Sequence, residues 1–162
     1  MRYTLYFLLL FMMPVFVVSG KSTAQNFDRE AYYAIMAAGT IAEINEELFI
    51  VRATSINEKE ALEGALLMRK AGLLKKPEEK LKAFKSGRIK LETALLDDKD
   101  NGEYRFLRVM IQEHAPHIVK YFKELADDRK QIIAVFTGLS PAVQKAILSY
   151  TKTSKILRPE DF

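Results

Sequence analysis

Apolar residues recur at helical spacing along almost the whole chain after residue 27, and glycine and proline seldom interrupt the pattern. The pattern predicts a single all-α domain of about seven helices, packed as a bundle or as a short array of helical repeats. The expected helical segments cover 29–38, 41–52, 58–72, 77–97, 103–114, 116–125, 131–136 and 141–151. Periodicity alone allows helix or strand for 131–136, and we expect helix because the neighbouring segments are helical.

Several helix boundaries carry recognisable signals. Glu43 follows Thr40 by three residues, and Glu60 follows Asn57 in the same way. Both pairs fit a capping box, in which side chains satisfy the free N–H groups of a helix start. Gly72 is expected to end the third helix, because glycine is the preferred residue just after a helix.

The fourth helix is expected to begin at Pro77, since a proline at the first helical position loses no hydrogen bond. Gly87 falls on its apolar stripe, where glycine is unfavourable by about 1 kcal/mol relative to alanine, and so indicates a close helix–helix crossing. The fifth helix is apolar over most of its circumference, which predicts a central, buried position.

The N-terminus resembles a secretory signal peptide. Arg2 precedes 14 apolar residues, 5–18, and a polar stretch ending in small residues at Ser22 and Ala24. The apolar run is shorter than the ~20 residues that a membrane-spanning helix needs, which favours cleavage over an uncleaved anchor. We expect residues 1–24 to be removed, with cleavage after Gly20 as the alternative. Residues 25–157 would then form a periplasmic or secreted helical domain with a frayed tail, 158–162.

Charge and cysteine content narrow the choice of function. The chain has no cysteine, which excludes disulfides and a lipid-modified cysteine. Removal of the signal segment, which holds Arg2 and Lys21, lowers the formal net charge from +4 to +2. So small a net charge argues against a dedicated nucleic-acid-binding protein. Once the signal segment is cleaved, we expect no transmembrane anchor to remain.

The remaining charge is unevenly distributed. Residues 69–90 hold nine Lys or Arg and two Glu, whereas residues 27–68 hold three basic and eight acidic side chains. One interpretation is a solvated basic helix face that complements the acidic segment within the fold. The other is a contact surface for a partner or, peripherally, for a membrane, with Lys82, Lys85 and Lys90 as candidate contacts.

Catalytic and metal-binding patterns are absent from the sequence. The two histidines, His114 and His117, are three apart across a proline and lack the spacing of zinc ligands. Carboxylates cluster near Glu43 and near Asp98, but neither cluster pairs an acid with a base in a recognisable site. No nucleophile elbow or phosphate-binding glycine loop occurs. We therefore expect no enzyme activity, no metal and no cofactor.

Two arginines stand on the mostly apolar fifth helix. Arg105 and Arg108 need partners if buried, because an unpaired buried charge is strongly unfavourable. We expect internal partners such as Glu43 or Glu47. The alternative is a ligand site in which Arg105, Arg108 and Gln112 hold a carboxylate or phosphate.

Gly87, Leu91 and Ala94 match the small–large–small spacing of the second helix of a tetratricopeptide repeat, and Lys99 stands where that repeat usually has proline. The stretch 57–101 thus resembles one degenerate repeat, although its helix pair is longer than the family's. More broadly, 61–121 resembles uncharacterised exported proteins of Gram-negative bacteria. The resemblance implies helix pairing and export.

These observations together predict an exported helical adaptor that binds another envelope protein without catalysis. The alternative is a periplasmic carrier of a small anionic or amphipathic ligand held between helices, which requires a cavity in the fold.

Overall fold

The computed structural model describes residues 27–162, and these form an all-α domain with seven α-helices. The predicted signal peptide, residues 1–24, lies outside the described residues. The helices are α1 (Arg29–Ala38), α2 (Ile41–Ala53), α3 (Lys59–Leu73), α4 (Pro77–Asp97), α5 (Gly102–Gln112), α6 (Leu125–Val135) and α7 (Pro141–Tyr150). Within 27–162, no helix is long and apolar enough to cross a membrane.

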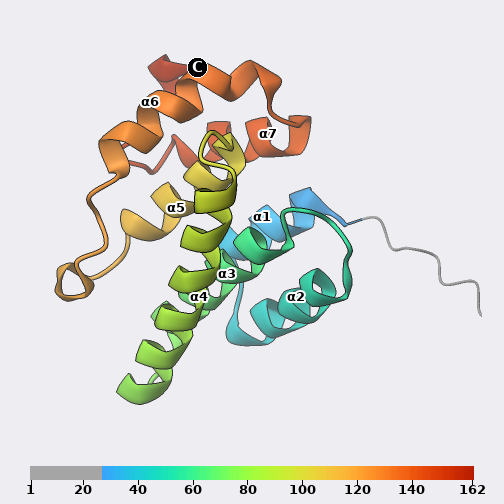
Figure 1. Cartoon of the computed structure of the whole chain (residues 1–162), viewed down its shortest axis with the longest axis vertical. Coiled ribbons are helices and arrows are strands. Elements are labelled where there is room, and N and C mark those ends of the chain that lie inside the picture. Colours follow the sequence, from blue (N-terminus) through green and yellow to red (C-terminus); the bar gives the residue numbers. More distant parts are fainter. Residues whose placement is uncertain (1–26) are drawn as a thin grey trace, which may run out of the picture.

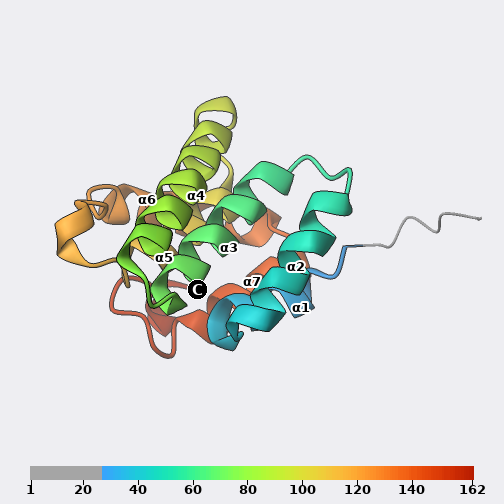
Figure 2. The ribbon, with the colours of Figure 1, turned by 90° about the horizontal axis from the view of Figure 1, so that it is seen from below.

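The helices α3 and α4 form a hairpin at the centre of the domain, with α1 and α2 on one side and α6 and α7 at one end (Figures 1 and 2). They cross at Gly64 and Gly87. A Cβ on Gly87 would lie 2.4 Å from the carbonyl oxygen of Gly64, and one on Gly64 would lie 2.7 Å from that of Gly87. Both distances are too short for any side chain. The close crossing expected at Gly87 is therefore present, with Gly64 as its counterpart.

The helix α5 is buried as its apolar circumference predicts. It packs against α3, α4 and α6, and Phe106, Leu107 and Val109 are fully enclosed. Its first turn is capped by the side chain of Asn101, which accepts a hydrogen bond from the Tyr104 N–H at 3.1 Å.

One of the two expected capping boxes forms. The Thr40 N–H donates to Glu43 at 2.8 Å, and the Thr40 hydroxyl accepts from the Glu43 N–H at 3.4 Å. The prediction for Asn57 and Glu60 is wrong, because Glu58 takes the cap position and makes no side-chain capping bond. Gly72 does not end α3 either, since the helix includes Leu73.

The helix expected over 116–125 is absent. Only a short 3₁₀ turn, His117–Val119, forms, and Lys120 then adopts a left-handed conformation with φ 48°. This turn lets the chain bury Tyr121, whose hydroxyl donates to Glu92 on α4 at 2.5 Å. The segment 131–135 is helical as expected and belongs to α6.

The expected frayed tail at 158–162 is also a wrong prediction, because these residues pack back on the domain. Arg129 of α6 donates from Nε to Asp161 at 3.0 Å, and the rings of Phe136 and Phe162 lie 4.6 Å apart. Just before the tail, Leu157 is fully buried. An ion pair and an aromatic contact together hold the C-terminus in place.

We expect Gly87→Ala to lower the free energy of unfolding by about 2 kcal/mol, because the backbone crossing must open while the gain in helix propensity is smaller. Gly72→Ala is the matched control. The space around Gly72 is open, so the same substitution there should stabilise by about 0.5 kcal/mol. Urea unfolding of both variants measures the difference, and a Gly87→Ala protein as stable as the wild type would contradict the close crossing.

Candidate functional site

An open pocket lies where α1, α3, α4, α5 and the end of α7 meet the segment 114–119. It encloses about 630 Å³. We call it the apolar pocket, because most of its wall consists of apolar side chains. Those used below are Met36, Met68, Leu81, Phe84, Met110 and Ile118.

The charges on the wall of the apolar pocket are of one sign. Arg69 and Lys80 are the charged side chains that line it, His114 adds an imidazole ring, and no Asp or Glu is among its lining residues. Arg69 is held in place, since its Nε donates to the carbonyl oxygen of Met36 at 3.0 Å. Lys80 is exposed on the first turns of α4. The wall therefore combines a wide apolar surface with cationic groups, an arrangement suited to an amphipathic anion.

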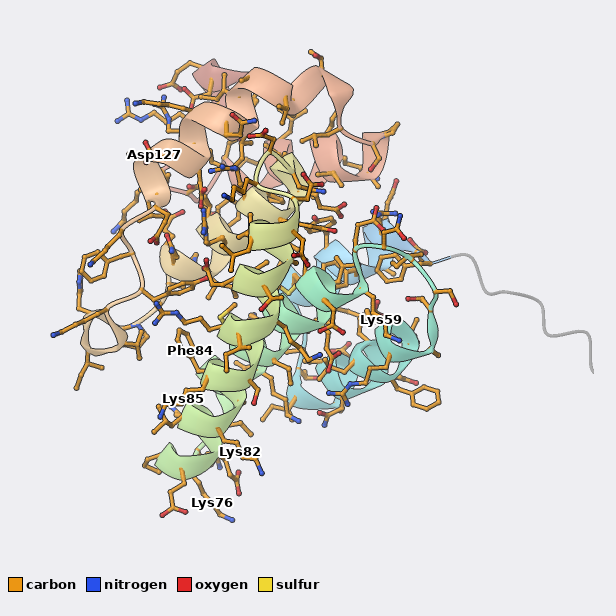
Figure 3. All side chains as sticks on the ribbon, viewed as in Figure 1. Lys59, Lys76, Lys82, Phe84, Lys85 and Asp127 are labelled. Atoms are coloured by element: carbon orange, nitrogen blue, oxygen red, sulfur yellow. The ribbon has the colours of Figure 1, made fainter. Side chains whose placement is uncertain are left out.

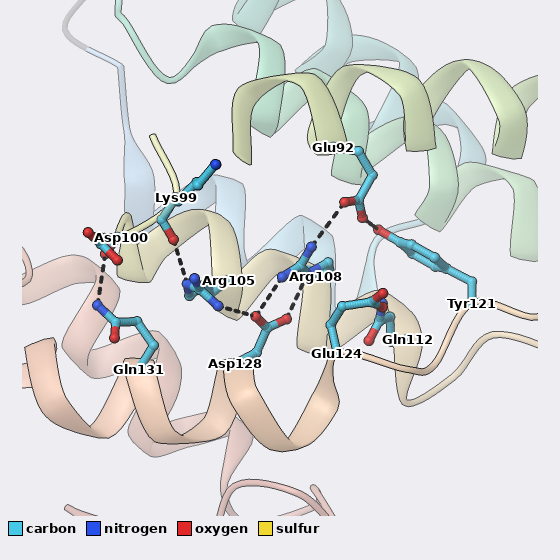
Figure 4. A network of polar contacts seen from close by, with 10 residues as sticks. All are labelled: Glu92, Lys99, Asp100, Arg105, Arg108, Gln112, Tyr121, Glu124, Asp128 and Gln131. Atoms are coloured by element: carbon cyan, nitrogen blue, oxygen red, sulfur yellow. Dashed lines mark hydrogen bonds and ion pairs between the residues drawn. The ribbon is translucent and has the colours of Figure 1, made fainter. Parts of the chain in front are cut away.

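Arg105 and Arg108 have internal partners, but not the expected ones. Arg108 makes a bidentate pair with Asp128 of α6, with Nε and Nη2 each 2.7 Å from a carboxylate oxygen (Figure 4). Arg105 adds a third bond to Asp128 at 2.8 Å. Neither arginine has an ion pair with Glu43 or Glu47 within the described part of the chain.

The same arginine continues the network toward α4. Arg108 Nη1 lies 3.0 Å from Glu92, whose other oxygen accepts from Tyr121 (Figure 4). Burial alone would lower the pKa of Arg108, but the hydrogen bond and charge of Asp128 outweigh it, and the pKa is raised. Burial also raises the pKa of Tyr121, reinforced by the charge of Glu92, so this phenol stays protonated and donates. The network is therefore charged and satisfied without a ligand.

Gln112 belongs to the same region and is buried. Its Nε2 donates to Glu124 at 2.6 Å, whereas its Oε1 has no partner among the described residues. Arg105, Arg108 and Gln112 all lie outside the lining of the apolar pocket. The structure thus offers a cavity, as the carrier alternative requires, but builds it from residues other than these three.

Lys82, Lys85 and Lys90 do not form one surface. Lys90 pairs with Glu60 at 2.6 Å and Glu63 at 3.1 Å on α3, which matches the expectation of a basic face complementing acidic neighbours. Lys82 and Lys90 both line a separate cavity of about 490 Å³, whereas Figure 3 shows Lys85 on another side of α4.

The remaining polar clusters are structural. Glu113 accepts from the hydroxyls of Tyr150 at 2.8 Å and Ser154 at 2.7 Å, fastening the chain after α7. His114 Nδ1 lies 3.0 Å from the carbonyl oxygen of Met110. Within residues 27–162, no group of three or more His, Cys, Asp and Glu is placed to hold a metal ion.

Sequence reasoning missed the apolar pocket, because its wall comes from five helices and an irregular segment. The available signal was the recurrence of methionine on apolar helix faces, at Met36, Met68 and Met110. Methionine is flexible and polarizable, so it is common where an apolar surface must adapt to different contacts.

Comparison with protein-family models, curated protein sequences and solved structures finds no match to this chain. The resemblance to a tetratricopeptide repeat and to exported Gram-negative proteins therefore stays a prediction.

We expect Asp128→Asn to lower the free energy of unfolding by about 3 kcal/mol, because it leaves Arg108 buried without its counter-charge. Asp127→Asn is the matched control, since this neighbour is exposed and its substitution should change stability by less than about 0.5 kcal/mol. Denaturant unfolding of both variants compares the two positions. Equal stability of the two proteins would show that the Arg108–Asp128 pair contributes little.

Proposed function

We propose that the protein is an exported, noncatalytic binding protein that holds a small amphipathic anion in the apolar pocket. The apolar pocket itself is the observation that carries the proposal. Export rests on the signal-like sequence of residues 1–24. The absence of a catalytic pattern in the sequence supports a binding role.

The size and lining of the apolar pocket support a ligand with a substantial apolar part. Ligand pockets of proteins typically range over ~300–1,000 Å³ and are lined mainly by apolar side chains. At about 630 Å³, the apolar pocket falls within that range. The flexible side chains of Met36, Met68 and Met110 suit an aliphatic chain of variable shape better than a rigid ring system.

The charges support a negative group at one end of that ligand. Lys80 and Arg69 attract an anion, and no carboxylate in the pocket wall opposes them. Because Lys80 is exposed, the charged end of the ligand can stay in contact with water while the apolar end is enclosed. A single-chain fatty acid has this chemistry.

We expect the protein to bind a fluorescent polyene fatty acid, with affinity lowered at least about tenfold by Gly72→Trp. Gly72 lies in the wall of the apolar pocket with open space around it, so the indole would occupy ligand volume without displacing the helix. Gly138→Trp is the matched control, because Gly138 also has open surroundings but does not line the pocket. Fluorescence titration measures both, and unchanged binding by Gly72→Trp would refute the proposal.

The charge requirement has its own test. Lys80→Glu should weaken fatty-acid binding about fivefold, whereas Lys82→Glu, which lines the other cavity, should leave it unchanged. The same titration at low salt compares the two reversals. Equal effects would mean that overall charge, not the position of Lys80, governs binding.

The adaptor role is a second candidate, favoured by a separate surface. Ile89 and Leu96 stand seven residues apart on one face of α4 and are 67% and 69% exposed. Lys82 precedes Ile89 by the same spacing, so the face would suit a partner helix with an apolar stripe and an acidic end.

If the protein has this role, the tagged protein purified from its envelope fraction should carry a stoichiometric partner. The double variant Ile89→Asp/Leu96→Asp should purify without that partner. Gly72→Trp should retain that partner, because it alters the apolar pocket and leaves the face on α4 intact. Retention by the double variant would remove this face as the binding surface.

A further inference from the structure

An exposed corner of the domain combines apolar side chains with positive charge. We call it the basic corner and define it by seven exposed residues, three on α4 and four in the segment 117–123: Leu81, Lys85, Arg88, Ile118, Lys120, Phe122 and Lys123. The segment projects from the body of the domain beside α4 (Figure 1). Ile118 is 88% exposed, more than any other large apolar side chain described.

The segment is held in position from beneath. Tyr121, 2% exposed, stacks edge-on against Phe84 with ring centres 5.8 Å apart, and Arg88 lies over its ring at 4.6 Å. Its hydroxyl is bonded to Glu92. Ile118 and Phe122 are therefore presented to solvent on either side of an anchored residue.

The charge at the basic corner is uniform. Residues 80–90 and 114–123 contain seven Lys or Arg and no Asp or Glu. Lys90 is neutralised by Glu60 and Glu63. The acidic residues that flank the two ranges have partners of their own: Glu79 in Lys76, Glu92 in Arg108 and Tyr121, Glu113 in Tyr150 and Ser154, and Glu124 in Gln112. The other six cations have no ion pair among the described residues.

The basic corner is continuous with the apolar pocket. Leu81 and Ile118 belong to the corner and also line the pocket, and Lys80 stands beside them. A surface that covered the corner would therefore also cover the opening through which a ligand enters. A projecting corner with isolated apolar side chains and scattered cations suits a lipid headgroup layer better than a flat, close-packed protein interface.

We propose that the basic corner docks on an anionic lipid bilayer, with Ile118 and Phe122 inserted among the headgroups and the opening of the apolar pocket facing the lipid. Docking of this kind would let an anionic single-chain lipid pass between bilayer and pocket without crossing water. The lipid-transfer part rests on the proposed function, whereas docking itself does not. Each cation near an anionic surface contributes about fivefold to the partition coefficient, so Lys85, Lys120 and Lys123 supply selectivity for charged lipid.

Co-sedimentation with lipid vesicles tests the proposal, using the protein as it is recovered from expressing cells so that all variants share one N-terminus. Vesicles of phosphatidylcholine with one third phosphatidylglycerol should bind the protein at least about tenfold more strongly than vesicles of phosphatidylcholine alone. Ile118→Glu should lower binding to the anionic vesicles about tenfold. Phe49→Glu is the matched control, since Phe49 is 74% exposed on α2, away from the corner, and this variant should bind as the wild type does.

Equal binding to both kinds of vesicle, or equal loss from Ile118→Glu and Phe49→Glu, would overturn the proposal. A second pair of variants separates docking from ligand binding. The double variant Lys120→Glu/Lys123→Glu should no longer bind the anionic vesicles but should still bind the fluorescent fatty acid, because neither lysine lines the apolar pocket. Gly72→Trp should still bind the anionic vesicles but should bind the fatty acid more weakly. Failure of the first variant to lose the vesicles would refute docking and leave the proposed function standing.

Discussion

The fully buried carboxylate of Asp128 is the group around which the C-terminal half of the domain is arranged. A lone carboxylate in that position would be strongly unfavourable, and three hydrogen bonds from Arg105 and Arg108 compensate for its lost hydration. These bonds join α5 to α6 across twelve residues, 113–124, that contain no α-helix. The position of α6 is therefore fixed by charge as well as by apolar contact. Residues 113–124, between the two helices, therefore need not follow either helix and instead take a path along the edge of the domain (Figure 1).

That path forms part of the apolar pocket. Glu113, bonded to Tyr150 and Ser154, and Tyr121, bonded to Glu92, hold the two ends of the stretch 113–121. The middle of this stretch contributes Pro116, Ile118 and Val119 to the wall. Arg105 and Arg108, for which a ligand site was the alternative prediction, hold α6 against α5 through Asp128. The ion pairs of Asp128 thus lie outside the apolar pocket, and an anion bound there, as we propose, would meet Lys80 and Arg69 without competing with Asp128.

The parts of the fold that could be predicted from the sequence depend on neighbouring residues. Thr40 and Glu43 form a capping box because both partners lie within one turn. Pro77 begins α4 because a proline deeper in a helix would lose a hydrogen bond that the first position does not need. Gly87 indicated the close crossing because a glycine on a packed helix face lets a second backbone approach. At the start of α3, the preference for Asn at a helix cap predicted Asn57, whereas Glu58 is the cap residue.

The parts that were missed depend on contacts between distant residues. Pro116 indicated a helix start, but burying Tyr121 against Phe84 and Glu92 outweighed the local tendency. Asp128 stood in an apparently exposed polar run, and only the docking of α6 on α5 shows that it is buried. The apolar pocket could not be located for the same reason, since no two of its three methionines belong to one helix.

The crossing at Gly64 and Gly87 has a mechanical consequence. Backbone lies against backbone there, with the carbonyl oxygen of each glycine close to the other glycine and the side chains of Met68 and Leu91 beside the contact. Sliding or separating α3 and α4 would require these two backbones to move apart. On the other side of the apolar pocket, the chain between α5 and Tyr121 contains only the short 3₁₀ turn His117–Val119. A large occupant would therefore be accommodated more readily by this stretch than by the hairpin. The apolar pocket accordingly has one wall made of tightly crossed helices and an opposite wall made of mostly irregular chain.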